Sequence, residues 1–228
     1  MVKSLKKNII IFGSGFQAKV IFSSIINSKK YNFLGFVDNL EINSPVITFN
    51  KKKYKIIDNF NNFNNLKKIK KLNGIIGIGS NFTRNKVYKE IIKLKLKISW
   101  ETIFFEGVNI SENVEIGDGS VIMGNVLINN NTTIGSHSII NSGSIIEHDN
   151  SFGDFSSTGP GVVTGGDVNV GKFSHIGIGA TILNGKKILS NTIIGAASLV
   201  TKNCKSYSIY YGVPAKKIAK RSFNKNYL

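Results

Sequence analysis

The sequence predicts two domains: an α/β domain with a small parallel sheet, followed by a parallel β-helix. Three observations support this fold class. The first hundred or so residues alternate strand-like apolar runs with helical patterns, and the chain from Ile110 to Lys205 repeats every six residues without a slip. The charge is also divided, with a net charge of +15 in residues 1–105, −3 in residues 106–205 and +5 in residues 206–228. We place the domains at residues 1–103 and 104–228.

The first domain is expected to consist of strands that alternate with helices. Residues 8–15, NIIIFGSG, predict a buried strand that runs into a glycine turn, and residues 16–28 have helical spacing of their apolar side chains. Residues 31–39 and 73–81 predict two further strands, and residues 82–96 an amphipathic helix. This order is typical of βαβ units and predicts a Rossmann-like parallel sheet.

The turn after the first strand carries a phosphate-binding pattern. Residues 13–18, GSGFQA, match G-x-G-x-x-A, and Asp38 follows Ala18 at about the interval at which such folds place an acid. Such glycines let a phosphate approach the backbone, and the start of the following helix favours its negative charge. A domain of roughly 100 residues is short for a full dinucleotide fold, so we expect a mononucleotide group instead. The candidate contacts are Gly13, Ser14, Gly15, Asp38, Asn39 and Arg84.

Within that set, Asp38 and Asn39 are expected to contact the ribose or the base, and Arg84 to pair with a phosphate. An NAD-binding oxidoreductase or regulator is a weaker alternative from the same pattern, but it leaves the second domain without a role.

The second domain consists of 16 consecutive hexads, of which 14 open with Ile, Val or Phe; Thr158 and Thr164 are the exceptions. Eight hexads have glycine at their second position. An amphipathic helix does not repeat every six residues, and a flat strand alternates every two. The first residue of each hexad should therefore point inward and stack on its equivalent in the next coil of a parallel β-helix.

These hexads resemble those of the hexapeptide-repeat acyltransferases, which fold as left-handed β-helices with about 18 residues per coil. Together with IIIFGSG, GFVDN (35–39) and GVPAKKI (212–218), they make nearly the whole chain similar to bacterial nucleotide-sugar acyltransferases. That family includes N-acetyltransferases of 4-amino-4,6-dideoxy sugars and sialic-acid O-acetyltransferases.

The resemblance implies an acetyl-CoA-dependent N-acetyltransferase that acts on a nucleotide-linked amino sugar for surface glycan biosynthesis. It also implies a homotrimer with active sites between neighbouring β-helices. The alternative is a sugar O-acetyltransferase, which the sequence barely separates from the first interpretation.

The resemblance places the catalytic base at His148, within IEHD (146–149). An amine that attacks a thioester must lose a proton, and imidazole, with an ordinary pKa of about 6.5, can accept it near neutral pH. Asp149 is the expected orienting acid, with Glu147 as its rival. One coil after His148 lies Gly166, whose N–H is the expected donor to the oxyanion.

Acetyl-CoA is expected along the later coils. The candidate contacts are Gly166, Ile178, Gly179, Gly195, Ala196, Gly212, Pro214 and Lys216. Lys202, Lys216 and Lys217 are the candidates for its phosphates.

Two positions depart from the family pattern, because Gln17 and Ser157 stand where many members have histidine. The sugar and its nucleotide are therefore not fixed by the resemblance. The intervals from His148 to His137 and to His175 are not whole numbers of coils. The three histidines should not share one edge, so we expect no metal site and a structural or surface role for His137 and His175.

The basic charge admits either nucleic acid or a phosphorylated small molecule as partner. Much of it lies in the Lys/Asn tract of residues 50–71, which lacks aromatics spaced for stacking on bases, so we interpret the tract as a solvated surface and expect no nucleic acid. No apolar stretch approaches the length that a membrane-spanning helix needs, so we expect no membrane segment and a cytoplasmic protein. Cys204 is the only cysteine, so no intrachain disulfide can form.

Overall fold

The computed structural model describes residues 6–60, 63–69 and 71–222. The chain forms two compact units, and each is described by itself. The first consists of Met1–Gly79 with Thr83–Ile103, and the second of Ser80–Phe82 with Phe104–Leu228.

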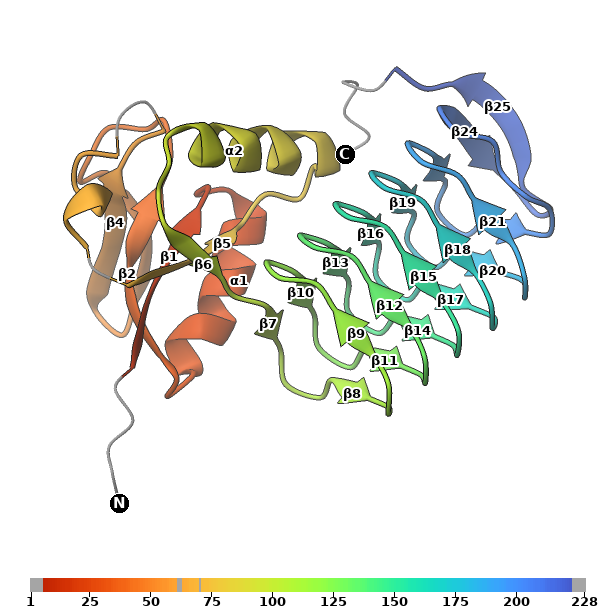
Figure 1. Ribbon diagram of the computed structural model, residues 1–228, viewed down its shortest axis with the longest axis horizontal. Coiled ribbons are helices and arrows are strands. Elements are labelled where there is room, and N and C mark those ends of the chain that lie inside the picture. Colours follow the sequence, from red (N-terminus) through yellow and green to blue (C-terminus); the bar gives the residue numbers. More distant parts are fainter. Residues whose placement is uncertain (1–5, 61–62, 70, 223–228) are drawn as a thin grey trace. The chain divides into compact units, whose positions relative to one another are not determined.

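The first unit contains a six-stranded sheet with the strand order β3-β4-β2-β1-β5-β6 (Figure 1). Neighbouring strands are parallel except for β3 and β4. The strands are β1 (Lys7–Phe12), β2 (Tyr31–Val37), β3 (Pro45–Phe49), β4 (Lys52–Asp58), β5 (Leu72–Ile76) and β6 (Ile98–Trp100), and the helices are α1 (Phe16–Asn27), η1 (Leu66–Lys68) and α2 (Asn81–Lys93). The predicted βαβ organisation is confirmed.

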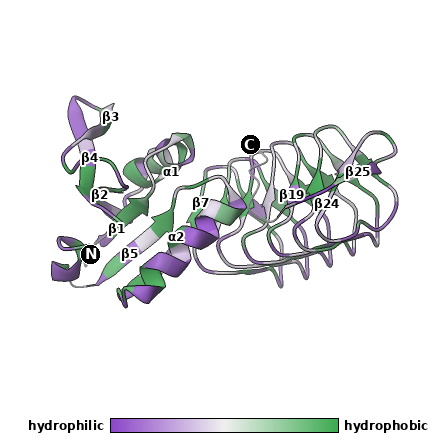
Figure 2. Ribbon diagram, turned by 90° about the horizontal axis from the view of Figure 1, so that it is seen from above, coloured by the Kyte–Doolittle hydropathy of each residue, from purple (hydrophilic) through white to green (hydrophobic). Residues whose placement is uncertain are grey.

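The central strand β1 is buried on both faces, as its run of apolar residues predicts. Ile11 lies beside Ala18 of α1, whereas its neighbours Ile10 and Phe12 belong to a cluster with Ile91 of α2. Because successive strand residues point to opposite faces, α1 and α2 cover opposite faces of the sheet. Figure 2 shows hydrophobic residues along β1 and β5 and both kinds of residue in α2.

The chain direction across the sheet reverses at β1, which lies between β2 on one side and β5 on the other. The loops that follow β1 and β5 therefore leave in opposite directions, one into α1 and the other into α2. In open α/β sheets, ligands bind outside the carboxyl ends of the strands at such a reversal. The glycine turn Gly13–Gly15 lies at this edge, directly after β1.

The β3–β4 hairpin, part of which lies within the Lys/Asn tract, was not predicted from the sequence. Its turn residues Asn50 and Lys51 have φ angles of 49° and 62°. Positive φ at both central residues is the geometry of a type I′ turn, whose twist matches that of the strands it joins. Lysine is uncommon at such a position, so the tract gave no clear turn signal.

The second unit is a parallel β-solenoid of three sheets, as predicted (Figure 1). Each strand pairs with the strand one full coil later, for example Ile122 with Ile140 and Ile146 with Thr164. The first sheet contains β7 (Ile103–Phe104), β10 (Val121–Ile122), β13 (Ile139–Ile140), β16 (Ser157–Thr158), β19 (His175–Ile176), β22 (Ile193–Ile194), β24 (Ser208–Tyr211) and β25 (Lys216–Lys220). The second contains β8 (Asn109–Ile110), β11 (Leu127–Ile128), β14 (Ile145–Ile146), β17 (Val163–Thr164), β20 (Thr181–Ile182) and β23 (Leu199–Val200). The third contains β9 (Glu115–Ile116), β12 (Thr133–Ile134), β15 (Ser151–Phe152), β18 (Asn169–Val170) and β21 (Lys187–Ile188).

From Ile122 to Val200 the first residue of each hexad points into one continuous stack, as predicted, and each of these side chains is at most 1% exposed. The first hexad departs from the prediction, because Ile110 is 38% exposed. The two exceptions, Thr158 and Thr164, also point inward. Their hydroxyl oxygens accept hydrogen bonds from the backbone N–H groups of Asn141 at 2.8 Å and Glu147 at 3.2 Å, one coil earlier. Both buried hydroxyl groups therefore have hydrogen-bond partners.

The corners of the solenoid use the left-handed backbone conformation at the fourth position of the hexads from Asn113 to Ala197. Asn, Asp and Gly occupy most of these positions, because they adopt positive φ at the lowest cost. Three bulky exceptions occupy successive coils at one corner: His137, Phe155 and Phe173. Their rings stack at 5.0 and 5.6 Å between centroids, so packing between coils accompanies the unfavourable φ.

The last coil is closed by an antiparallel pair, β24 and β25. Cys204 is 2% exposed at the end of the apolar stack, and burial raises the pKa of its thiol to about 12. The thiol is therefore protonated and unreactive near neutral pH. No helix among the described residues is long and apolar enough to cross a membrane.

Candidate active site

His148 lies at a corner of the solenoid, between β14 and β15. Its side chain is 58% exposed, and its Nδ1 lies 2.7 Å from Oδ2 of Asp149. Asp149 occupies the left-handed corner position, with φ of 58°. This hydrogen bond leaves Nε2 as the ring nitrogen available to another molecule.

Asp149 is itself held by the preceding coil. Asn131 Nδ2 donates to Asp149 Oδ1 at 3.2 Å, so the two carboxylate oxygens contact two different side chains. Asn131 was not among the residues predicted for the site. The signal was present, because Asn131 lies one full coil before Asp149 and therefore at the same corner position.

Glu147, the rival to Asp149, has a different partner. Its Oε2 accepts a hydrogen bond from Asn129 Nδ2 at 2.8 Å, and Asn129 Oδ1 accepts one from Ser111 at 3.2 Å. These three residues form a ladder across successive coils, next to the corner that holds His148. The geometry therefore favours Asp149 as the residue that orients the imidazole.

The charges around His148 stabilise its protonated form. The hydrogen bond with Asp149 raises the pKa of His148 above 6.5, and the nearby carboxylates of Glu147 and Asp167 act in the same direction. The same hydrogen bond, together with that from Asn131, lowers the pKa of Asp149. Asp149 is therefore ionised at neutral pH and stabilises a positive charge on the imidazole.

Gly166 lies directly against this imidazole, as the coil period predicted. A Cβ atom at residue 166 would lie 2.5 Å from Cε1 and 2.6 Å from Nε2 of His148. The rungs are joined by a hydrogen bond of 3.0 Å from the N–H of Asp167 to the carbonyl of His148. Only glycine at position 166 leaves room for the ring in this position.

The glycine turn of the first unit is tied to the end of β2. Ser14 Oγ donates to Asp38 Oδ2 at 2.6 Å, and the N–H of Asn39 donates to Asp38 Oδ1 at 2.7 Å. Gly13 has φ of 102°, and a Cβ there would lie 2.9 Å from Ile78 Cγ1. By contrast, a Cβ at Gly15 would meet nothing within 4 Å, so the turn is open on that side.

The structure corrects the prediction for Arg84, which was expected to pair with a phosphate. The residue is 1% exposed, and its Nη1 donates to the carbonyls of Ile78 and Gly79 at 2.9 and 2.8 Å. A buried guanidinium that ties down the loop after β5 is not available to a ligand. Its role is structural.

The two positions that depart from the family pattern have different surroundings. The Nε2 atom of Gln17 is buried and has no hydrogen-bond partner among the residues that the structure describes. Ser157 Oγ lies 2.8 Å from Nδ1 of His175, its neighbour in the next coil, so His175 contacts Ser157 rather than His148.

The candidate acetyl-CoA contacts are mostly exposed. Ile178 is 60% exposed, and a Cβ at Gly179 would meet nothing within 4 Å. Six further candidates are exposed as well: Ala196, Lys202, Gly212, Pro214, Lys216 and Lys217.

The prediction that Gly195 contacts acetyl-CoA is not supported by the structure. Gly195 is buried, and the ring of Tyr211 lies where its Cβ would be. Because the ring covers this glycine, its lack of a side chain serves packing rather than contact with a cofactor.

Within residues 6–60, 63–69 and 71–222, no three His, Cys, Asp or Glu side chains lie close enough together to hold a metal ion. His137 is buried against Phe155, and His175 lies in β19.

Two family models match the chain. Residues 8–91 match the PglD N-terminal domain, and residues 107–142 match the bacterial transferase hexapeptide model of six repeats. The two matches together cover more than half of the chain. The chain therefore combines the PglD N-terminal domain with the hexapeptide repeats of bacterial transferases, which is the domain content of PglD-type hexapeptide-repeat acetyltransferases. None of the curated proteins matches it.

Solved structures agree with this PglD-type assignment. The chain is 26% identical to PerB from Caulobacter crescentus in complex with CoA and GDP-perosamine, with a TM-score of 0.83 over 93% of this chain and 97% of that one. A mutant of GDP-perosamine N-acetyltransferase from the same organism gives the same TM-score at 25% identity, with the same coverage of both chains. The acetyltransferase domain of PglB from Neisseria gonorrhoeae, with acetyl coenzyme A, shares the fold at 20% identity, with a TM-score of 0.82 over 94% of this chain and all of that one.

Proposed function

We propose that this protein transfers an acetyl group from acetyl-CoA to the amino group of a nucleotide-linked amino sugar, with His148 as the general base. The observation that carries the proposal is the imidazole of His148, fixed by Asp149 through Nδ1 and lying against Gly166. The 25–26% identical structures with CoA and GDP-perosamine support the choice of substrates. The sugar proposed is a 4-amino-4,6-dideoxy sugar.

In the proposed reaction the neutral amine attacks the thioester carbonyl, and the C–N bond forms as Nε2 of His148 accepts a proton from nitrogen. The N–H of Gly166 donates to the oxyanion of the tetrahedral intermediate. The C–S bond then breaks, and the thiolate of CoA takes up a proton. The products are the N-acetylated sugar and free CoA.

Asp149 has two roles in this reaction. Its hydrogen bond keeps the proton of the neutral imidazole on Nδ1, which leaves the lone pair of Nε2 free for the amine proton. Its negative charge also stabilises the imidazolium that forms in the transition state. Asn131 holds the second carboxylate oxygen and so limits rotation of the Asp149 side chain.

On the substrate side, we propose that the nucleotide binds at the turn of Gly13, Ser14 and Gly15. The backbone at Gly15 is open, and the start of α1 favours a phosphate. Asp38 and Asn39 would contact the ribose or base. Although Asp38 already accepts two hydrogen bonds, a carboxylate has capacity for more.

On the cofactor side, the proposed contacts of acetyl-CoA are Ile178, Gly179, Ala196, Gly212, Pro214 and Lys216, with Lys202 and Lys217 near its phosphates. The proposal also includes a homotrimer with active sites between neighbouring β-helices, and a cytoplasmic location, where nucleotide sugars and acetyl-CoA are available.

The test is a product assay with a panel of 4-amino-4,6-dideoxy sugars linked to GDP, UDP, dTDP or CMP, together with the matching 4-hydroxy sugars. Purified protein and acetyl-CoA are incubated with each sugar, and mass spectrometry with fragmentation locates the acetyl group. We expect N-acetylation of one amino sugar and no modification of its hydroxyl analogue.

Acetylation of the hydroxyl analogue with equal efficiency would instead make the protein an O-acetyltransferase. Absence of any acetylated sugar across the panel, from protein that still binds CoA, would contradict the proposal.

A further inference from the structure

A second cationic site lies on the first unit, formed by two adjoining hollows of about 440 and 730 Å³. The hollows share Lys71, Leu72, Lys97 and Ile98. Six lysines line them, and no acidic residue does: Lys6, Lys7, Lys67, Lys71, Lys95 and Lys97. We call this surface the lysine groove. Both volumes fall within the range of small-molecule sites, which is about 300–1,000 Å³.

The lysine groove lies at the amino ends of the parallel strands, whereas the proposed nucleotide turn lies at their carboxyl ends. Lys7, Leu72 and Ile98 are the first residues of β1, β5 and β6, whereas Gly13 follows the last residue of β1. A strand rises by about 3.3 Å per residue, so Lys7 and Gly13 are separated by roughly 20 Å. The groove is therefore a different site from the one proposed for the nucleotide sugar.

The positive charges in the lysine groove are largely uncompensated. Lys7 pairs with Glu101, but none of the other five lysines has an ion-pair partner among the residues the structure describes. Two of them, Lys71 and Lys95, also adopt positive φ, of 53° each, where Gly or Asn is usual. An anion that contacts several uncompensated ammonium groups is bound favourably.

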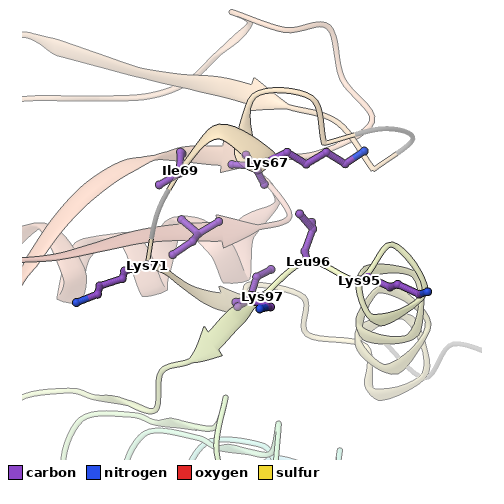
Figure 3. Close-up of a pocket in the computed structure, with 9 residues that line it drawn as sticks. Lys67, Ile69, Lys71, Lys95, Leu96 and Lys97 are labelled. Carbon is purple, nitrogen blue, oxygen red and sulfur yellow. The ribbon is translucent and has the colours of Figure 1, made fainter.

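The arrangement of the amines favours an extended anion over a single phosphate. In Figure 3, Lys67 and Lys95 extend to one side of the hollow, Lys71 extends to the other, and Lys97 lies between them. Lysine is a flexible point charge that suits phosphate without demanding two-pronged geometry. Because the site is concave and its charges are spread along it, a linear chain of phosphates can contact several lysines at once.

We propose that the lysine groove binds an oligophosphate, that is, a linear chain of three or more phosphate groups, either free or attached to a nucleoside. The proposal does not depend on the acetyltransferase reaction. It differs from the solvated surface that the sequence alone suggested, because the six lysines line a cavity and only Lys7 has an ion-pair partner among the residues that the structure describes.

The experiment is calorimetric titration of the full-length protein with inorganic tripolyphosphate at about 50 mM salt, where electrostatic screening is modest. Saturating CoA is present throughout, so that the proposed cofactor site is occupied. The groove variant carries Lys71→Ala and Lys97→Ala, the two lysines shared by both hollows. The control variant carries Lys53→Ala and Lys55→Ala, which remove the same charge from exposed positions of β4.

We expect one tripolyphosphate per chain, affinity at least tenfold weaker in the groove variant, and a change below twofold in the control. A nucleoside triphosphate should compete with tripolyphosphate, and orthophosphate should bind at least tenfold more weakly than tripolyphosphate. If the groove variant does not fold, Lys71→Gln with Lys97→Gln keeps the side-chain length and replaces it.

Three results would overturn the proposal. Equal weakening in the two variants would mean diffuse attraction by the net charge. Binding that is absent with saturating CoA, but present in a parallel titration without CoA, would place the anion at the cofactor site. Retention of single-stranded DNA or of anionic vesicles that depends on Lys71 and Lys97, without tripolyphosphate binding, would assign the groove to a nucleic acid or a membrane surface.

Discussion

His148 is exposed on the protein surface, yet its ring is fixed by two contacts, the carboxylate of Asp149 and the backbone at Gly166. We expect His148→Ala to lower kcat at least about a hundredfold, because the amine proton loses its acceptor. The melting temperature should change little, since a largely exposed side chain contributes little to stability. Steady-state kinetics and thermal unfolding measure the two effects. Near-normal turnover by this variant would remove His148 from the mechanism.

The raised pKa of His148 predicts a shifted pH profile. Only the neutral imidazole accepts a proton, and its fraction grows as the pH rises through the pKa. Because Asp149 holds that pKa above 6.5, the rising limb of kcat/KM should lie above pH 6.5 in the wild type. In Asp149→Asn the limb should move to lower pH, with a reduced maximum. Superimposable limbs in the two proteins would show that Asp149 does not set the pKa of the base.

At the scale of elements, the hexads predicted the solenoid because nearly all hexads have the same pattern. The first residue is apolar and points inward, and the fourth residue forms a corner. The adjacency of His148 and Gly166 followed from the hexads together with the 18-residue coil that the resemblance implies. The Asn131 contact could have been predicted from the same period. Arg84 and Gly195 could not, because their burial depends on Gly79 and Tyr211, and no periodicity in the sequence links these positions.

The β3–β4 hairpin shows a second limit. Its strand pattern is broken by lysines, and its turn uses Asn50 and Lys51 where Asn-Gly would have been the clear signal. The hairpin also pairs through β4 with β2, a strand from an earlier part of the chain, and this contact cannot be read from the local sequence.

The inward threonines provide a test of how the solenoid satisfies its polar atoms. Thr158→Val keeps the shape and adds apolar surface, but it removes the acceptor of the Asn141 N–H. We expect a loss of about 1–3 kcal/mol in unfolding free energy, from the unsatisfied donor. Thr181→Val, on the outward side of β20, is the matched control and should change stability by less than about 0.5 kcal/mol. Chemical denaturation measures both, and a Thr158→Val protein as stable as the wild type would refute the role of the hydroxyl.

At the scale of the whole molecule, the two units are stabilised by different means. The solenoid relies on one apolar stack, whereas the strongly basic first unit contains a buried carboxylate among cations. Glu101 is 8% exposed, pairs with Lys7 and Lys30, and accepts a hydrogen bond from Tyr31 at 3.0 Å. Burial alone would raise the pKa of Glu101, but the hydrogen bonds from Lys7, Lys30 and Tyr31 outweigh burial and lower it.

This balance predicts a pH-dependent contribution to stability. A carboxylate with a lowered folded-state pKa stabilises the protein above its unfolded pKa, near 4.5, and the contribution disappears as the pH falls through the folded value. Glu101→Gln should therefore lower the melting temperature by about 2–4 °C at pH 7. The difference from the wild type should shrink below pH 4.5. A gap that stays constant from pH 7 to pH 3 would contradict this account.

From β8 to β23, facing strands of the solenoid are one coil of 18 residues apart. A whole coil can be gained or lost at either end of the solenoid without altering the contact between His148 and Gly166. Inserting even one residue into the hexads between them would instead shift the register of the following hexads, so that Gly166 would no longer lie against the imidazole. Lineages of such proteins are therefore free to vary in height while the chemistry at this corner stays the same.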